Sequence, residues 1–288
     1  MDKDPINLER KIQAEADLVT GWFTRNEMIC SSEKTKLLII GTRAARQSKT
    51  ESKNLQLGVS ISGERKSESS SEKLLGVIVN NTATFQNHLY GDTENLGLMK
   101  QLSTRVGMLK KLGKFMPPAR LKMVMEGMFN SKLQYGMTVW GRVWNIPGSL
   151  DEDAAVRKCP SLTKEDVRKL QVLQNKCLRL ITHSDYKTPT RVLLEKTNAL
   201  SVHQQIAHLS LSQVYNIQKT KLPAYHFNRL FVNPNRIEFK KSIARANFFY
   251  QSSRLWSALP DNVKAAYNKS TFKKQCKSWV QCNILIKP

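Results

Sequence analysis

The chain has 288 residues, and its 40% hydrophobic and 24% charged residues suit one or two folded domains with a real core. Its formal charge is +23 at pH 7, far more than solubility requires of a small domain. So positive a field favours polyanions, with nucleic acid ahead of an anionic membrane or an acidic protein. The apolar runs are too short to cross a bilayer, so no membrane span is expected.

The cysteines indicate a reducing compartment. There are five of them, widely scattered, with no Cys-x-x-Cys pair. The first residues are acidic and contain no apolar segment of the signal-peptide kind. We therefore expect an intracellular protein of the nucleus or the cytoplasm.

The positive charge is concentrated in the later part of the chain. Residues 1–72 carry 12 basic and 11 acidic side chains, so the remaining residues hold a net charge of +22. This division predicts two functional halves, with phosphate contacts concentrated in the second.

The first section has a mixed pattern. Residues 7–26 have the apolar spacing of a helix. Three short segments that follow have strand patterns: 36–40, 55–61 and 73–79. Two polar segments between them are expected to be loops: 42–53 and 62–71. The section is therefore a small α/β region whose sheet would be incomplete by itself.

After residue 93 the pattern becomes helical. Segment 94–114 places apolar side chains on one face and lysines opposite them. The buried face is expected to hold Met99, Leu102, Val106, Leu109 and Leu112. Pro117-Pro118 then favours a helix start, and the next helix should bury Leu121, Val124, Met125, Met128, Phe129 and Leu133.

Capping residues predict three further helices. Thr163, followed by Glu165 and Asp166, suits the N-terminus of a helix with Leu170 and Cys177 in its buried stripe. Thr188-Pro189 predicts the start of a short helix. Ser201 with Gln204 forms a candidate capping box for a helix that ends near Thr220.

The last seventy or so residues, 219–288, contain 14 basic and 2 acidic side chains interleaved with many aromatic ones. This mixture suits a surface that tracks a single strand and stacks its bases. Aromatic residues are also ordinary core material, and most of these can equally be core.

Together these patterns predict an α+β fold that is mainly α. A small, incomplete antiparallel sheet comes first, followed by two helical regions. The expected divisions are 1–92, a helical region at 93–147, and a basic, mostly helical C-terminal domain at 148–288.

The order of several short strings resembles the reverse transcriptases of non-LTR, LINE-like retrotransposons of the jockey type. Trp22…Asn26…Ser32–Lys36 followed by an apolar segment looks like the late part of that family's palm. Leu74-Leu75-Gly76-Val77 looks like its primer-gripping hairpin. The resemblance implies that Lys34 approaches the triphosphate of an incoming nucleotide.

Further strings resemble the thumb and the domain that follows it. They are Leu112…Phe115…Pro117-Pro118, Leu133–Gly136…Trp140-Gly141, Leu173–Lys176…Leu178–Thr182, Tyr250…Arg254–Pro260 and Ser270–Lys273. Each string is weak alone, but together they cover nearly the whole chain in the expected order. The resemblance implies a helical thumb that lies along a template–primer duplex.

One departure from the family concerns catalysis. The sequence contains no Asp-Asp dipeptide, and the resemblance begins downstream of the family's catalytic turn. Polymerisation needs carboxylates that hold divalent metal ions. We therefore expect no catalytic residue, no cofactor and no polymerase activity in this chain alone. An intact relative would be an RNA-directed DNA polymerase that uses Mg²⁺ and nucleoside triphosphates.

Three interpretations remain open. The chain can be a C-terminal polymerase fragment that binds RNA, RNA–DNA or DNA template–primer duplexes. It can be a host-retained module, derived from a retroelement, that binds another protein. It can also be a piece of a longer active enzyme whose N-terminal polymerase region is missing here.

The best candidate surface for nucleic acid is the basic stretch from Lys100 to Lys122, which has seven basic residues and no acidic one. A solvated helix face usually mixes both signs. The expected phosphate-contacting residues are Lys100, Arg105, Lys110, Lys111, Lys114, Lys122, Arg168, Lys169, Lys176 and Arg179.

No metal site or hydrolytic site is predicted. His203 and His208 are five residues apart, which places them on different faces of a helix. Cys276 and Cys282 have no histidine nearby in the sequence. The densest acidic cluster, Asp151–Asp153, is expected to lie in a solvated linker.

Overall fold

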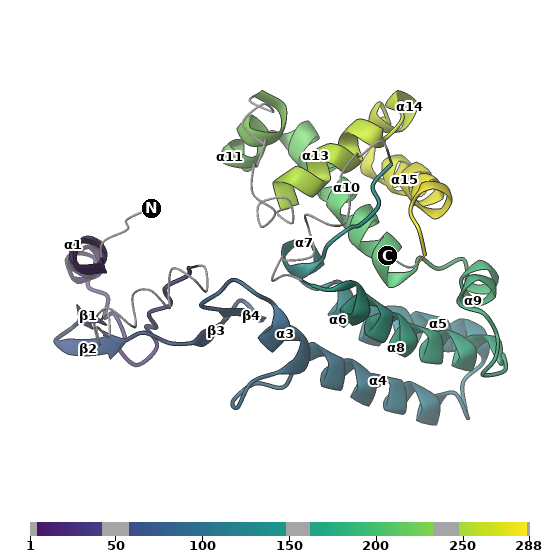
Figure 1. Ribbon diagram of the computed structural model, residues 1–288, viewed down its shortest axis with the longest axis horizontal. Helices are drawn as coiled ribbons and strands as arrows, with labels where there is room; N and C mark the ends of the chain where they lie inside the picture. Colours follow the sequence, from purple (N-terminus) through teal and green to yellow (C-terminus); the bar gives the residue numbers. More distant parts are fainter. Residues whose placement is uncertain (1–4, 42–57, 148–161, 233–247, 287–288) are drawn as a thin grey trace. The chain divides into compact units, whose positions relative to one another are not determined.

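The computed structural model describes residues 5–41, 58–147, 162–232 and 248–286 (Figure 1). The chain divides into two compact units, Met1–His88 and Leu89–Pro288. The first unit combines a long helix with two β-hairpins, and the second is helical. The fold is therefore α+β and mainly α, as the sequence predicts.

The first hairpin packs against helix α1, Pro5–Arg25. Strands β1, Gly58–Ile61, and β2, Glu64–Ser67, pair in antiparallel register. The Gln13 side chain of α1 holds Ser60 of β1, because its amide accepts from the Ser60 N–H at 2.8 Å and donates to the Ser60 carbonyl at 2.9 Å. The expected loop at 62–71 is wrong, since residues 64–67 within it pair with β1. Its charged sequence gave no alternation from which a strand could be predicted.

The second hairpin consists of β3, Ser71–Leu74, and β4, Val77–Asn80. Leu75 and Gly76 form the turn with φ angles of 46° and 84°. Two left-handed residues in a two-residue loop match the twist of an antiparallel hairpin. The single strand expected at 73–79 is therefore wrong, whereas the hairpin implied by the family resemblance is present.

The strand expected at 36–40 is also wrong. Within the described residues, only Leu37 of this segment makes a bridge, with Glu68, so no ladder forms along the apolar run. The described strands form two separate two-stranded sheets rather than one. Among the described residues of this unit, the buried apolar side chains are Val59, Ile61, Val77 and Ile78. The expected loop at 42–53 lies outside the described residues.

Short helix α3, Gln86–Tyr90, spans the boundary between the two units, and the second unit continues with long helix α4, Leu98–Leu112. Of the predicted buried face, Leu102 and Leu109 are fully buried, whereas Met99, Val106 and Leu112 are half-buried. After a turn the chain continues through α5, Pro118–Met125, π-helix η1, Glu126–Asn130, α6, Ser131–Gln134, and α7, Met137–Trp140.

The π-helical turn explains the spacing of the buried residues in this segment. Leu121, Met125, Phe129 and Leu133 recur every four residues and are all buried. In a regular α-helix each such step turns the side chain by about 40° beyond a full turn. A wider turn offsets this drift and keeps the four side chains facing the core.

Helix α8, Lys164–Thr182, starts at the predicted capping box, in which Thr163 and Asp166 exchange side-chain and backbone hydrogen bonds. Helix α9, Thr190–Thr197, follows Pro189, and α10, Val202–Thr220, starts at the predicted box of Ser201 and Gln204. The remaining elements are α11, Ala224–Phe227, π-helix η2, Asn228–Val232, α13, Phe248–Ala258, α14, Asp261–Lys264, and α15, Lys269–Asn283.

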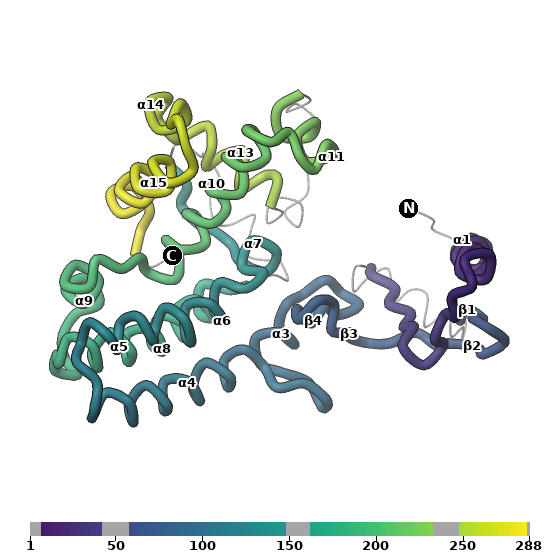
Figure 2. Tube along the Cα trace, turned by 180° about the vertical axis from the view of Figure 1, so that it is seen from behind, coloured from purple at the N-terminus to yellow at the C-terminus, as the bar shows by residue number. Residues whose placement is uncertain are grey.

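The helices of this unit pack around α8 and α10. Helices α4 and α5 lie against α8, while α10 contacts α7, α8, α13 and α15 (Figures 1 and 2). Most described aromatic residues beyond residue 222 are buried or half-buried. Phe272 is fully buried and stacks on Tyr215 with 4.2 Å between ring centroids. The core interpretation therefore holds for most of them.

Candidate nucleic-acid interface

The outer face of α4 presents lysines to solvent. Lys100, Lys110 and Lys111 are exposed on the helix, and Lys114 is exposed just beyond its end. Within the described parts of the chain, none of these four ammonium groups has an ion pair or a side-chain hydrogen bond. Because α4 turns by about 100° per residue, burial of Leu102 and Leu109 directs Lys100 and Lys111 to the opposite side.

Helix α8 has a second basic face. Arg168, Lys169 and Lys176 are exposed, as the helical pattern predicts. Arg168 lies 3.5 Å from the carboxylate of Glu165, but both side chains are more than half exposed, so this ion pair contributes little. Lys176 has no side-chain partner among the described residues. Lys176 is thus available to a phosphate, and Arg168 is only weakly held.

Lys169 is fixed by a neighbouring tyrosine. Its ammonium group lies 3.2 Å from the Tyr90 hydroxyl and 5.2 Å from the centroid of the Tyr90 ring. The Tyr90 hydroxyl in turn donates to the Asp166 carboxylate, which also accepts from the Thr163 N–H and hydroxyl. The hydrogen bond to Tyr90 raises the pKa of Lys169, which therefore stays charged. Lys169 thus also holds Tyr90 beside the start of α8.

Arg105 and Lys122 form hydrogen bonds within the fold. The Arg105 guanidinium donates to the Met128 carbonyl in the π-helical turn. The Lys122 ammonium donates to the Thr197 carbonyl at 2.7 Å, at the C-terminal end of α9. That end of a helix carries partial negative charge and unpaired carbonyls, which a cation stabilises. The structure thus brings these two residues to backbone acceptors.

Lys277 of α15 acts beside Lys122 and was not anticipated from the sequence. Its ammonium donates to the Asn198 carbonyl at 2.6 Å, one residue beyond the Lys122 contact. Burial and the positive charge of Lys122 lower the pKa of Lys277. Two lysines from distant segments therefore cap α9, a role that only the tertiary structure reveals.

We expect Lys122→Met to lower the free energy of unfolding and to leave nucleic-acid affinity largely unchanged. The methionine keeps the apolar stem but removes the bond to the Thr197 carbonyl, a loss of about 1 kcal/mol in the free energy of unfolding. Urea denaturation followed by circular dichroism measures that loss, and Lys110→Met is the exposed control. A Lys122 variant with unchanged stability and strongly weakened nucleic-acid binding would contradict this role.

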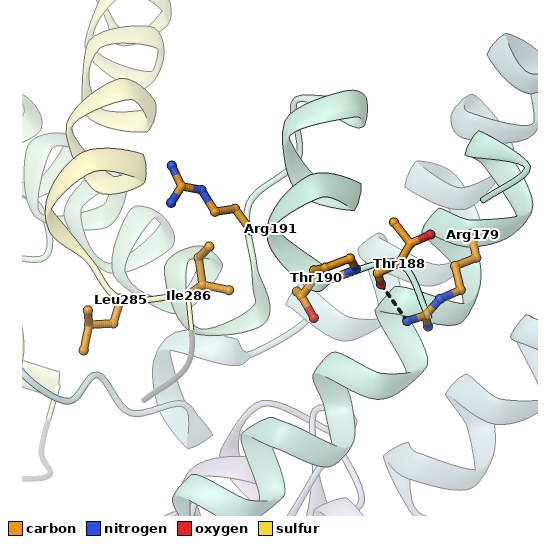
Figure 3. A pocket seen from close by; sticks show the side chains of 7 residues that line it. Arg179, Thr188, Thr190, Arg191, Leu285 and Ile286 are labelled. Carbon is orange, nitrogen blue, oxygen red and sulfur yellow. Dashed lines mark hydrogen bonds between the residues drawn. The ribbon is translucent and has the colours of Figure 1, made fainter. Parts of the chain in front are cut away.

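Arg179 borders an open hollow of about 530 Å³ (Figure 3). Its guanidinium donates to the Thr188 carbonyl at 3.2 Å and lies 5.5 Å from the Tyr186 ring centroid. In Figure 3, Thr190 lies between Arg179 and Arg191. The lining residues are Arg179, Thr188, Pro189, Thr190, Arg191, Leu285 and Ile286, with no acidic side chain among them. The hollow therefore lies between the C-terminal part of α8, at Arg179, and the start of α9.

Arg191 is a lining residue that the sequence reasoning missed. It forms an ion pair with Glu195 at 2.8 Å on the exposed side of α9, where both side chains are well solvated. A smaller cavity of about 130 Å³ shares Thr190 and Ile286 with the hollow and extends along α8 past Arg168. The region is completed by Leu285 and Ile286, which are distant in sequence from α8 and α9.

Residues 173–176 of α8, which belong to a string that resembles the retrotransposon family, contain two amide side chains with a structural role. Gln174 is buried and donates to the Leu200 carbonyl at 2.8 Å. Asn175 donates to the Thr190 hydroxyl at 2.9 Å. These amides join α8 to α9 and to the connection before α10, so they position the basic faces rather than form them.

Two predictions concern the first unit: that of Lys34 and that of the second hairpin. Lys34 is exposed in a turn. Leu74 and Leu75 are 66% and 83% exposed at the hairpin tip, Gly76 completes the turn, and Val77 is buried. Their roles beside a nucleotide and a primer stay predictions. An apolar tip held by a tight turn is nevertheless a suitable shape for contacting a ligand.

The described residues hold no group of three or more His, Cys, Asp or Glu side chains that could bind a metal ion. Both ring nitrogens of His203 already have partners: Nε2 accepts from the Trp144 N–H at 3.0 Å, and Nδ1 donates to the Leu285 carbonyl at 2.8 Å. Burial raises the pKa of Cys276 to about 12, so this thiol is not a nucleophile. The acidic cluster at 151–153 lies outside the described residues.

None of the described helices combines the length and apolarity needed to span a membrane. Comparison with protein families, with curated proteins and with solved structures gives no match.

Proposed function

We propose that the second unit binds the backbone of nucleic acid, as the thumb-like and C-terminal part of a non-LTR retrotransposon reverse transcriptase. The observation that carries this proposal is the face of α4, where four exposed lysines lack partners within the described chain. No acidic residue interrupts the sequence from Lys100 to Lys122. Because a merely solvated face usually mixes both signs, this arrangement favours a polyanion.

The chemistry of such a surface is electrostatic. Ammonium groups on a helix replace the counterions that phosphates hold in solution, and this release drives binding. Contacts to phosphate fix the position of a duplex but carry no sequence information. We therefore propose sequence-independent binding of RNA, RNA–DNA or DNA template–primer duplexes, with Arg168 and Lys176 of α8 adding further contacts.

We propose that the chain alone does not polymerise. In a longer product, Lys34 would face the incoming triphosphate and the tip at Leu74 and Leu75 would contact the primer end. Carboxylates outside this chain would hold the Mg²⁺. Primer extension with purified 288-residue protein tests this point directly. Incorporation of nucleotides by that protein would overturn it.

The binding proposal is tested by fluorescence anisotropy with labelled RNA–DNA duplexes over a series of salt concentrations. We expect log affinity to fall linearly with log salt, with a slope of about 0.9 for each neutralised duplex phosphate. Duplexes of unrelated sequence should bind alike. Absence of binding at low salt would refute the proposal.

A protein-binding module is the second candidate, and helix α1 of the first unit favours it. Leu18 and Trp22, one helical turn apart, are 65% and 51% exposed, and Val19 beside them is 52% exposed. An apolar stripe of this kind suits a partner helix. If this candidate is correct, Leu18→Glu with Trp22→Glu should abolish a protein interaction and leave duplex affinity unchanged.

A further inference from the structure

The turn between α4 and α5 holds an aromatic side chain out in solvent. Phe115 is 85% exposed, whereas the other phenylalanines described in this unit are buried or half-buried. The backbone of the turn is well ordered by hydrogen bonds. The Phe115 and Met116 N–H groups both donate to the Leu112 carbonyl, at 2.9 and 3.0 Å. Phe115 is thus a ring presented at a defined position.

Two prolines restrict the backbone that follows Phe115. Pro117 caps α5 in an extended conformation, and Pro118 occupies its first helical position. Proline fixes its own φ angle, so little backbone freedom remains to be lost when the turn meets a ligand. The ring therefore offers contact area with a small loss of conformational entropy on binding.

The surroundings of the ring are positively charged. Lys110, Lys111 and Lys114 precede it within five residues, and all three are exposed without partners in the described chain. A ring beside ammonium groups suits a ligand that has both flat apolar faces and negative charge. Nucleic acid has both, since bases stack on aromatic rings and phosphates bind cations. Insertion into a membrane surface would instead need a broad apolar face.

Within a duplex, each base is covered by its neighbours on both faces. Only an unpaired base or the last pair of a duplex can offer a free face to a protruding ring. The lysine face of α4 leads along the helix to this ring, because Lys100 and Lys111 lie about 16 Å apart along the axis. A duplex held by α4 would then end, or open, near Phe115.

We propose that Phe115 stacks on an unpaired base at a junction of duplex and single strand, while Lys110, Lys111 and Lys114 hold the adjacent phosphates. This proposal rests on the proposed function and narrows its ligand to a junction. The turn between α4 and α5 would then favour a junction over a continuous duplex, a preference that the lysines alone cannot supply.

The test compares a blunt RNA–DNA duplex with the same duplex carrying a single-stranded overhang. The overhang contains the fluorescent base 2-aminopurine next to the junction, and the full chain is used. Phe115→Leu keeps the apolar volume but removes the aromatic face. We expect this variant to bind the overhang duplex about five- to tenfold more weakly, and the blunt duplex nearly as well as wild type.

The fluorescence of 2-aminopurine should be quenched by the wild-type chain and not by Phe115→Leu. Tyr267→Leu is the matched control, because Tyr267 is 93% exposed but lies in the C-terminal region. Equal affinities and equal quenching for wild type and Phe115→Leu would overturn the stacking proposal. The proposal would also be overturned if Phe115→Leu weakened binding to anionic phospholipid vesicles more than binding to the overhang duplex. Failure of wild type to bind either duplex would instead refute the proposed function.

Discussion

Replacing Lys100, Lys110, Lys111 and Lys114 together with glutamine should weaken duplex binding by roughly a hundredfold at moderate salt. All four side chains are exposed and have no partners within the described chain, so nothing internal depends on their charge. Glutamine has a helix propensity close to that of lysine, which leaves α4 intact. The variant isolates the electrostatic contribution of one face.

The salt dependence gives a second measure of the same effect. If each of the four lysines neutralises one phosphate, the slope of log affinity against log salt should decrease by about 3 to 4. Fluorescence anisotropy over a salt series measures both quantities. Thermal unfolding should be nearly unchanged, because exposed lysines without partners contribute little to stability.

A matched control separates this face from net charge. Lys187, Lys196, Lys219 and Lys221 are exposed elsewhere in the second unit, and their replacement by glutamine removes the same total charge. We expect this control variant to lose much less affinity. An equal loss in both variants would mean that the field of the whole unit drives binding, and α4 would then have no special role.

The helices could be predicted from the sequence because their signals are local. Apolar spacing gave the buried face of α4, and the side chains of Thr163 and Ser201 marked the starts of α8 and α10 before any packing was known. Both capping boxes are present with both of their hydrogen bonds. Such signals lie within one turn of helix, so a single sequence contains them.

The strands were harder because their partners decide them. Segment 36–40 is apolar, yet only Leu37 pairs, whereas the charged segment Glu64–Ser67 is a strand because β1 lies beside it. Strand formation depends on cross-strand neighbours more than on intrinsic preference. The pairing could not be predicted without knowing where β1 would lie.

The candidate site was predicted in part for a similar reason. Composition located the positive charge after residue 72, and periodicity placed Lys100 and Lys111 on the outer face of α4. Neither could show that Arg105 and Lys122 donate to backbone carbonyls in other segments. A basic residue that caps a distant helix has the same local sequence pattern as one that binds phosphate.

The stability of the chain should decrease in mild acid because of His203. This side chain is fully buried, and burial lowers its pKa from 6.5 to about 4, while the bond to the Leu285 carbonyl opposes the shift and the charge of Lys164 adds to it. Between these two pH values the unfolded chain binds a proton at His203 that the folded chain does not. The free energy of unfolding must therefore decrease as the pH falls from 6.5 towards 4.

The expected loss from this one group is roughly 3 kcal/mol, since each unit of pKa corresponds to about 1.4 kcal/mol. Urea denaturation at a series of pH values, followed by tryptophan fluorescence, measures it. His203→Gln should be less stable at neutral pH but should show a shallower decrease in acid. His208→Gln is the comparison variant, because burial also lowers the pKa of His208.

The geometry explains why the effect should be concentrated at His203. The neutral ring donates from Nδ1 to the Leu285 carbonyl and accepts at Nε2 from the Trp144 N–H. A second proton on Nε2 would face the Trp144 N–H, so protonation requires that the segment after α7 separate from α10. If wild type and His203→Gln lose stability equally between neutral and acidic pH, this pair of hydrogen bonds does not control the acid sensitivity of the second unit.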